Sequence, residues 1–84
     1  MKALQEYVAQ KNAWGKIFGS APMSLSNAQD RKRIAQHIDS ELSPENLHCD
    51  GEISHSQAMA KYRKLATVAR QLQKLDPSVQ IYEL

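Results

Sequence analysis

The sequence is poor in the residues that interrupt helices and in the cysteines that form disulfides. Three glycines and three prolines among 84 residues argue against an all-β or a disordered chain. The single cysteine, Cys49, excludes an intrachain disulfide and fits a reducing compartment. No apolar run approaches the roughly 18 residues that a membrane span needs, and residues 1–6 lack the apolar core of a signal peptide. We therefore expect one soluble, cytoplasmic domain with no membrane partner.

The common motifs of catalysis and cofactor binding are also missing. The sequence contains no C-x-x-C and no H-E-x-x-H, and the glycines of residues 15–20 lack the spacing of a phosphate-binding loop. A chain of this length has little room for both a catalytic apparatus and a substrate pocket in one subunit. We expect neither an enzyme nor a bound small-molecule cofactor.

One short region does concentrate residue types that bind metals or transfer protons. His48, Cys49 and His55 are the ligand types that zinc prefers, and Asp50 and Glu52 lie between them. Adjacent ligands such as His48 and Cys49 point apart in an extended chain. We therefore interpret this region as a polar loop, and a metal-binding or hydrolytic site here is the third functional hypothesis.

Three amphipathic stretches predict a mainly α, three-helix domain spanning residues 1–84. The expected helices lie near 2–18, 26–42 and 54–75, followed by an extended, β-prone tail at 79–84. An ordered acidic loop, residues 43–53, connects the second helix to the third. The tail is expected either to pair as a strand or to lie extended over the helices.

The helix predicted at 54–75 is expected to be the centre of the fold, because its apolar positions recur at three- and four-residue spacing. Its start is marked by Ser54 and Gln57, which form a capping box. The basic residues border the apolar arc, and the outermost strip is neutral, so we expect a central packing helix and not a DNA-reading one. The arc comprises Ala58, Met59, Tyr62, Leu65, Ala66, Val68, Ala69 and Leu72, and the neutral strip comprises Ala60, Thr67 and Gln71.

The other two helices are expected to cover this arc. The first helix should pack on it through Tyr7, Val8, Trp14 and Phe18. The second should begin with a capping box of Ser26 and Gln29, and should close the third side of the core. Its core residues are expected to be Ile34, Ile38 and Leu42.

Charge is segregated along the chain. Residues 39–52 contain five acidic residues and no lysine or arginine, whereas residues 55–75 contain five basic residues and no acidic one. Such segregation marks either a binding surface or an acidic loop packed near a basic helix.

The leading functional hypothesis is a small non-catalytic protein-interaction or regulatory module, adaptor-like, which binds a protein partner or a second copy of itself. Its expected surface is an aromatic patch on the first helix, where Lys11 lies within reach of two rings. That patch comprises Tyr7, Lys11, Trp14 and Phe18. The alternative hypothesis is a nucleic-acid-binding protein that uses Lys11, Arg31, Lys32, Arg33, Lys61, Lys64 and Arg70.

Overall fold

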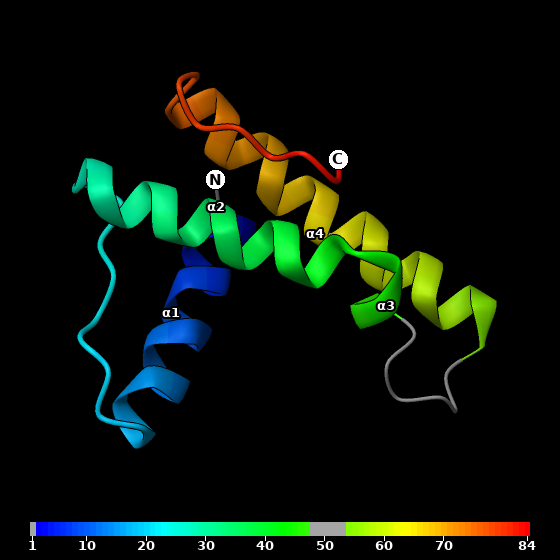
Figure 1. Ribbon diagram of the computed structural model, residues 1–84, viewed down its shortest axis with the longest axis horizontal. Helices are drawn as coiled ribbons and strands as arrows, with labels where there is room; N and C mark the ends of the chain where they lie inside the picture. Colours follow the sequence, from blue (N-terminus) through cyan, green and yellow to red (C-terminus); the bar gives the residue numbers. More distant parts are fainter. Residues whose placement is uncertain (1, 48–53) are drawn as a thin grey trace.

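Four helices occur in the computed structural model, which describes residues 2–47 and 54–84 (Figure 1). They are α1 (Lys2–Ile17), α2 (Ala28–Leu42), α3 (Pro44–Leu47) and α4 (His55–Leu75). No strand occurs in these two ranges, so the predicted mainly α class is confirmed. None of the described helices is long and apolar enough to cross a membrane.

Helix α4 begins as its sequence predicts. The Ser54 hydroxyl accepts the backbone N–H of Gln57 at 3.2 Å, and the Gln57 side-chain oxygen accepts the Ser54 N–H at 3.0 Å. The helix ends before Asp76 and Pro77, because a proline in the next turn cannot donate the required hydrogen bond. Its buried residues are Ala58, Leu65, Ala66, Val68, Ala69 and Leu72.

Two members of the predicted apolar arc are less buried than expected. Met59 is 37% exposed and Tyr62 is half-buried. Both lie in the N-terminal part of α4, which extends past the end of α2 and has the short α3 beside it (Figure 1). The arc is therefore buried without interruption from Leu65 to Leu72, whereas Ala58 is its one buried member in the N-terminal third.

Helix α2 begins one residue later than the sequence suggested. The predicted cap, Ser26, instead contacts the Ser24 hydroxyl at 2.7 Å. The N-cap is Asn27, whose side-chain oxygen accepts the N–H groups of Gln29 at 2.9 Å and Asp30 at 3.4 Å. Asparagine caps helices at least as well as serine does, so the local turn at Ser24 decides between them. The predicted capping box at Ser26 is therefore wrong.

The core lies where α1 and α2 meet α4. As predicted, Ile34, Ile38 and Leu42 of α2 are at most 2% exposed and close the third side. Leu4, Tyr7 and Val8 fill the core from α1. The expected packing of Trp14 and Phe18 is wrong, because these residues are 62% and 77% exposed.

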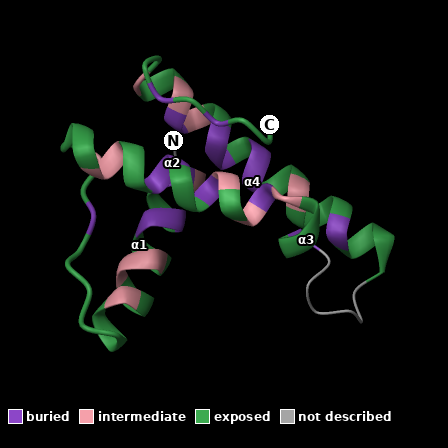
Figure 2. Ribbon diagram, viewed as in Figure 1, coloured by how far each residue is buried: buried purple, intermediate pink, exposed green. Residues whose placement is uncertain are grey.

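The direction of α1 explains this difference. Only its N-terminal half is buried, and the rest of the helix projects away from α2 and α4 (Figures 1 and 2). A hydrogen bond from the Leu4 N–H to the Gln71 side-chain oxygen, 2.9 Å long, fixes the buried end. Gln71, expected in the outermost strip of the third helix, is half-buried and satisfies an N–H group in the first turn of α1.

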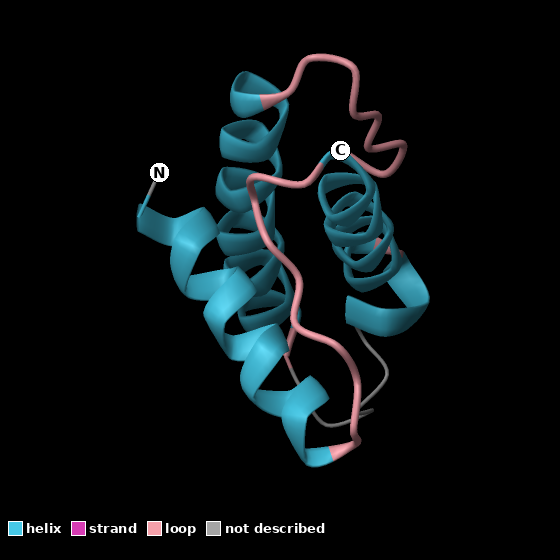
Figure 3. Cartoon of the chain, turned by 90° about the vertical axis from the view of Figure 1, so that its left-hand side faces the viewer, coloured by secondary structure: helices cyan, strands magenta, loops and turns pink. Residues whose placement is uncertain are grey.

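The C-terminal tail contains turns at 77–78 and 82–83 and no strand, so strand pairing is wrong and the alternative of an extended tail is not confirmed (Figure 3). Val79 and Ile81 are buried, whereas Leu84 stays 39% exposed. The Asp39 carboxylate accepts the N–H groups of Tyr82 at 3.0 Å and Glu83 at 2.8 Å. Backbone N–H groups need hydrogen-bond acceptors, and here the carboxylate of an α2 side chain takes the place of the carbonyl groups of a neighbouring strand.

Most of the predicted acidic loop lies outside the described residues. Ser43 and the one-turn helix α3 account for its first five residues. Residues 48–53, which include the candidate ligands His48 and Cys49, fall outside.

Candidate functional site

Three side chains tie α1 to the end of α2. The Tyr7 hydroxyl donates to one oxygen of the Glu41 carboxylate, and the Lys11 ammonium donates to the other at 3.0 Å. The same ammonium lies 5.4 Å from the centre of the Tyr7 ring, within the range of a cation–π contact. Sequence spacing placed the rings of Tyr7 and Trp14 near Lys11, and in the structure the ammonium contacts the Tyr7 ring. The role of Glu41 was missed because no helical spacing relates it to α1.

The Tyr7 hydroxyl is engaged within the fold by Glu41 and is not free to bind a partner. Burial raises the pKa of Tyr7, and the hydrogen bond and negative charge of Glu41 raise it further. The hydroxyl therefore remains a neutral donor throughout the physiological range. Since Tyr7 is 8% exposed, it forms part of the floor beneath the surface described next.

A groove of about 350 Å³ lies between α1 and α4. The two helices meet where the Leu4 N–H contacts the Gln71 side chain, and α1 diverges from α4 beyond its first half (Figure 1), with Trp14 and Lys61 both lining the groove. Each helix contributes positions three or four residues apart, which is one stripe of its surface. We call this feature the α1–α4 groove, lined by Ala3, Glu6, Tyr7, Gln10, Lys11 and Trp14 of α1, Glu41 of α2, and Lys61, Lys64, Leu65 and Val68 of α4.

The projecting end of α1 carries three large, exposed apolar side chains. Trp14, Ile17 and Phe18 are 62%, 72% and 77% exposed. Trp14 and Ile17 share one side of α1, and Phe18 directly follows the helix in a turn that is hydrogen-bonded to it. We call these three residues the apolar tip. Ile17 was not singled out from the sequence, although its place between Trp14 and Phe18 was a signal that could have found it.

The connection to α2 holds this end of α1 in place. Gly19 has a φ of +78°, which a glycine adopts freely, and the Ser20 N–H donates to the Gly15 carbonyl at 2.7 Å to close the last turn. The Asn12 side chain donates to the Met23 carbonyl at 2.9 Å and accepts the Met23 N–H at 2.7 Å. Since Met23 is buried, this pair fastens the connection to the core.

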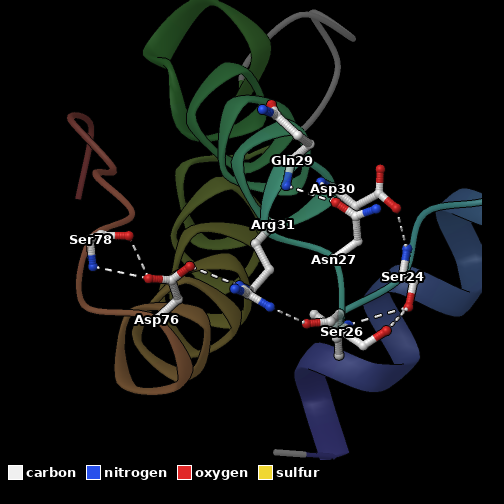
Figure 4. A network of polar contacts seen from close by, with 9 residues as sticks. Ser24, Ser26, Asn27, Gln29, Asp30, Arg31, Asp76 and Ser78 are labelled. Atoms are coloured by element: carbon white, nitrogen blue, oxygen red, sulfur yellow. Dashed lines mark hydrogen bonds and ion pairs between the residues drawn. The ribbon is translucent and has the colours of Figure 1, made fainter.

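The seven basic residues of the nucleic-acid hypothesis are placed on different surfaces. Arg31 donates to the Asp76 carboxylate at 2.7 Å and to the Leu25 carbonyl at 2.9 Å (Figure 4). A hydrogen bond from Ser78 and the Arg31 contact hold the pKa of Asp76 below its usual range. Arg33 lies 3.5 Å from Asp30.

Lys11 and Arg33 line one hollow together, and three of the seven line the groove. Lys11, Lys61 and Lys64 line the α1–α4 groove. Lys32 lines a separate hollow beside the C-terminal tail, and Arg70 is exposed on α4 outside the groove.

Of the three candidate metal ligands, His55 alone lies among the described residues. His55 is exposed in the first turn of α4. Within residues 2–47 and 54–84, no group of three or more histidine, cysteine or acidic side chains is placed to hold a metal ion.

The chain matches no protein-family model, no curated protein and no solved structure.

Proposed function

We propose that this protein is a small, non-catalytic interaction module of the cytoplasm, adaptor-like, which binds a segment of a partner protein. The binding surface is the apolar tip together with the α1–α4 groove. One observation carries the proposal: three large apolar side chains lie exposed at the end of a helix whose other half builds the core. Clustered apolar exposure of this kind is typical of protein–protein contact sites.

The tip suits association for an energetic reason. Fully burying a large apolar side chain contributes about 1.5–3 kcal/mol, so covering three of them contributes on the order of several kcal/mol. A tryptophan is also a residue type that often dominates binding energy at interfaces. Because Trp14 and Ile17 lie in a regular helix, little backbone ordering opposes their burial.

The nucleic-acid alternative receives less support from the side-chain contacts. Lys11, Arg31 and Arg33 each contact a carboxylate, which offsets the positive charge that would attract phosphates. A binding constant for mixed DNA or RNA that falls steeply with added salt would favour this alternative.

A site-specific photo-crosslinker tests the proposal. Placed at Phe18, it should capture a partner protein that the same group placed at Tyr82 does not, since both residues are highly exposed but lie on different surfaces. The purified partner should then bind the chain saturably in calorimetry. Trp14→Ala and Phe18→Ala should each weaken that binding roughly tenfold or more, and Tyr82→Ala should leave it unchanged.

Two results would contradict the proposal. Equal affinity of the purified partner for the parent chain and for the Trp14→Ala/Phe18→Ala double variant would remove the tip from the interface. The other result is a solution mass that doubles with increasing concentration and returns to that of the monomer in the same double variant. It would show that the tip binds a second copy of the chain and not a different protein.

A further inference from the structure

We infer that the partner segment is an amphipathic helix with an acidic flank, seated in the α1–α4 groove. This inference rests on the proposed function, since it specifies the chemistry of the segment bound there. Three features support it: the shape of the groove, the charge on its two rims and the lack of a matching helix within residues 2–47 and 54–84.

The shape of the groove favours a helix. Ala3, Gln10 and Trp14 belong to one stripe of α1, and Lys61 and Val68 belong to one stripe of α4. Two diverging stripes of this kind leave room for a third helix, whose side chains at i, i+3 or i+4, and i+7 contact both of them. The α1 stripe from Ala3 to Trp14 is about 16 Å long, from eleven steps of about 1.5 Å each, so the occupant needs about three turns.

The floor of the groove is apolar. Tyr7, Leu65 and Val68 are 8%, 8% and 3% exposed and form its base. Trp14 lies at the open end and continues into the apolar tip. The apolar stripe of the occupant would therefore lie over Leu65 and Val68 and extend toward Trp14.

The two rims carry different charges. Lys61 and Lys64 form the α4 rim, on a helix that has five basic residues and no acidic one. On the opposite side, the Glu41 carboxylate is offset by Lys11 and hydrogen-bonded by Tyr7, which leaves Glu6 as the exposed charge. The flank of the occupant that faces α4 should therefore carry carboxylates. Rim charges of this kind decide which partner binds more than they decide how tightly.

A second copy of the chain fits this groove poorly. Helix α4 of another copy would place its basic residues against Lys61 and Lys64. Helix α1 carries one acidic residue, Glu6, against three basic ones: Lys2, Lys11 and Lys16. The three carboxylates of α2, on Asp30, Asp39 and Glu41, already accept hydrogen bonds within the chain. None of the three long helices that the structure describes therefore supplies a free acidic flank, so the charges favour a different protein.

Three designed peptides of about 18 residues, long enough to form helix, test the inference. The first has a leucine stripe and a glutamate flank, the second has the same stripe and a lysine flank, and the third keeps the glutamates but replaces the leucines with glutamine. Trp14 is the single tryptophan of the chain, so its emission reports occupancy of the groove. Only the first peptide should shift that emission to shorter wavelength at micromolar concentration.

A charge-matched pair of variants tests the α4 rim. Lys61→Glu/Lys64→Glu should weaken binding of the acidic peptide roughly five- to tenfold and strengthen binding of the basic one, because two rim contacts change sign. Arg63→Glu/Arg70→Glu makes the same change in net charge on the same helix, at exposed positions that do not line the groove. This control should change the affinity less than twofold.

The possible failures separate the two proposals. Equal or tighter binding of the basic peptide, with Trp14 still reporting it, would overturn the acidic occupant and leave the docking surface intact. A loss of binding that is equal in both charge variants would assign the effect to net charge and overturn the role of Lys61 and Lys64. No response to any peptide would overturn the groove as a helix site, and the Phe18 crosslink would then decide separately whether the tip binds a partner.

Discussion

The Tyr7 hydroxyl donates a hydrogen bond to the Glu41 carboxylate across 34 residues of sequence, and so fastens α1 to the end of α2. The same carboxylate accepts the Lys11 ammonium. These contacts and the Leu4–Gln71 hydrogen bond restrain the part of α1 that precedes Trp14. The apolar tip therefore projects from a helix that is anchored at its other end.

The Tyr7 contact predicts a loss of stability in alkaline solution. Its pKa is raised above the usual value near 10, so the stabilising contribution is fully present below pH 10 and is lost as the pH rises toward the folded-state pKa. The unfolding free energy of the parent chain should fall above pH 10 by up to about 1 kcal/mol per pH unit more than that of Tyr7→Phe. Urea unfolding at several pH values measures this difference. Tyr82→Phe, at an exposed tyrosine, should follow the parent chain, and coincident curves for Tyr7→Phe and the parent would contradict the assignment.

The Tyr7 and Glu41 side chains should also be coupled energetically at neutral pH. Glu41→Ala leaves the Tyr7 hydroxyl without its acceptor, at an expected cost of about 1–2 kcal/mol. The same change made in the Tyr7→Phe background should cost less, because no donor is left unpaired. A double-mutant cycle from urea unfolding should give a coupling of about 1 kcal/mol, and additive losses would show that the contact contributes nothing.

Asn12 should contribute to stability through the backbone of Met23. Asn12→Ala removes two hydrogen bonds to a buried residue and should lower the unfolding free energy by about 1–2 kcal/mol. Amide hydrogen exchange at Met23 should accelerate in the variant. Gln5→Ala, at an exposed position of the same helix, is the control and should change stability by less than about 0.5 kcal/mol.

The start of α2 offers a direct comparison of two adjacent residues. Asn27→Ala removes the observed cap and should destabilise the fold by about 1 kcal/mol. Ser26→Ala should cost only a few tenths of a kcal/mol, since its hydroxyl contacts Ser24 outside the helix. Thermal unfolding of the two variants checks the order. The reverse order would restore Ser26 as the cap.

The apolar tip should be dispensable for folding. Trp14→Ser and Phe18→Ser should each change the unfolding free energy by less than about 0.5 kcal/mol, because both side chains are mostly exposed. Leu72→Ala, at a fully buried position, should cost about 2–5 kcal/mol. Chemical denaturation followed by circular dichroism compares the three. A large loss in either tip variant would assign that residue to the fold and not to binding.

The local features of the fold could be predicted from sequence because they depend on near neighbours. Ser54 and Gln57 lie three residues apart, so a capping box can be recognised without tertiary information. The three- and four-residue spacing likewise predicted Ile34, Ile38 and Leu42 as one buried stripe. Spacing alone could not decide between Ser26 and Asn27, since both residues are good caps and the choice depends on what Ser24 contacts.

What the sequence determined is therefore the mainly α class, the central helix and the existence of an apolar side on α1. Periodicity defines a face, but it does not say how far along the helix that face is covered. The tertiary structure decided that Tyr7 lies in the core whereas Trp14 and Phe18 are exposed, because α1 diverges from its neighbours beyond its first half (Figure 1). The groove beside Lys61 and Lys64 likewise exists only once two helices distant in sequence are brought together.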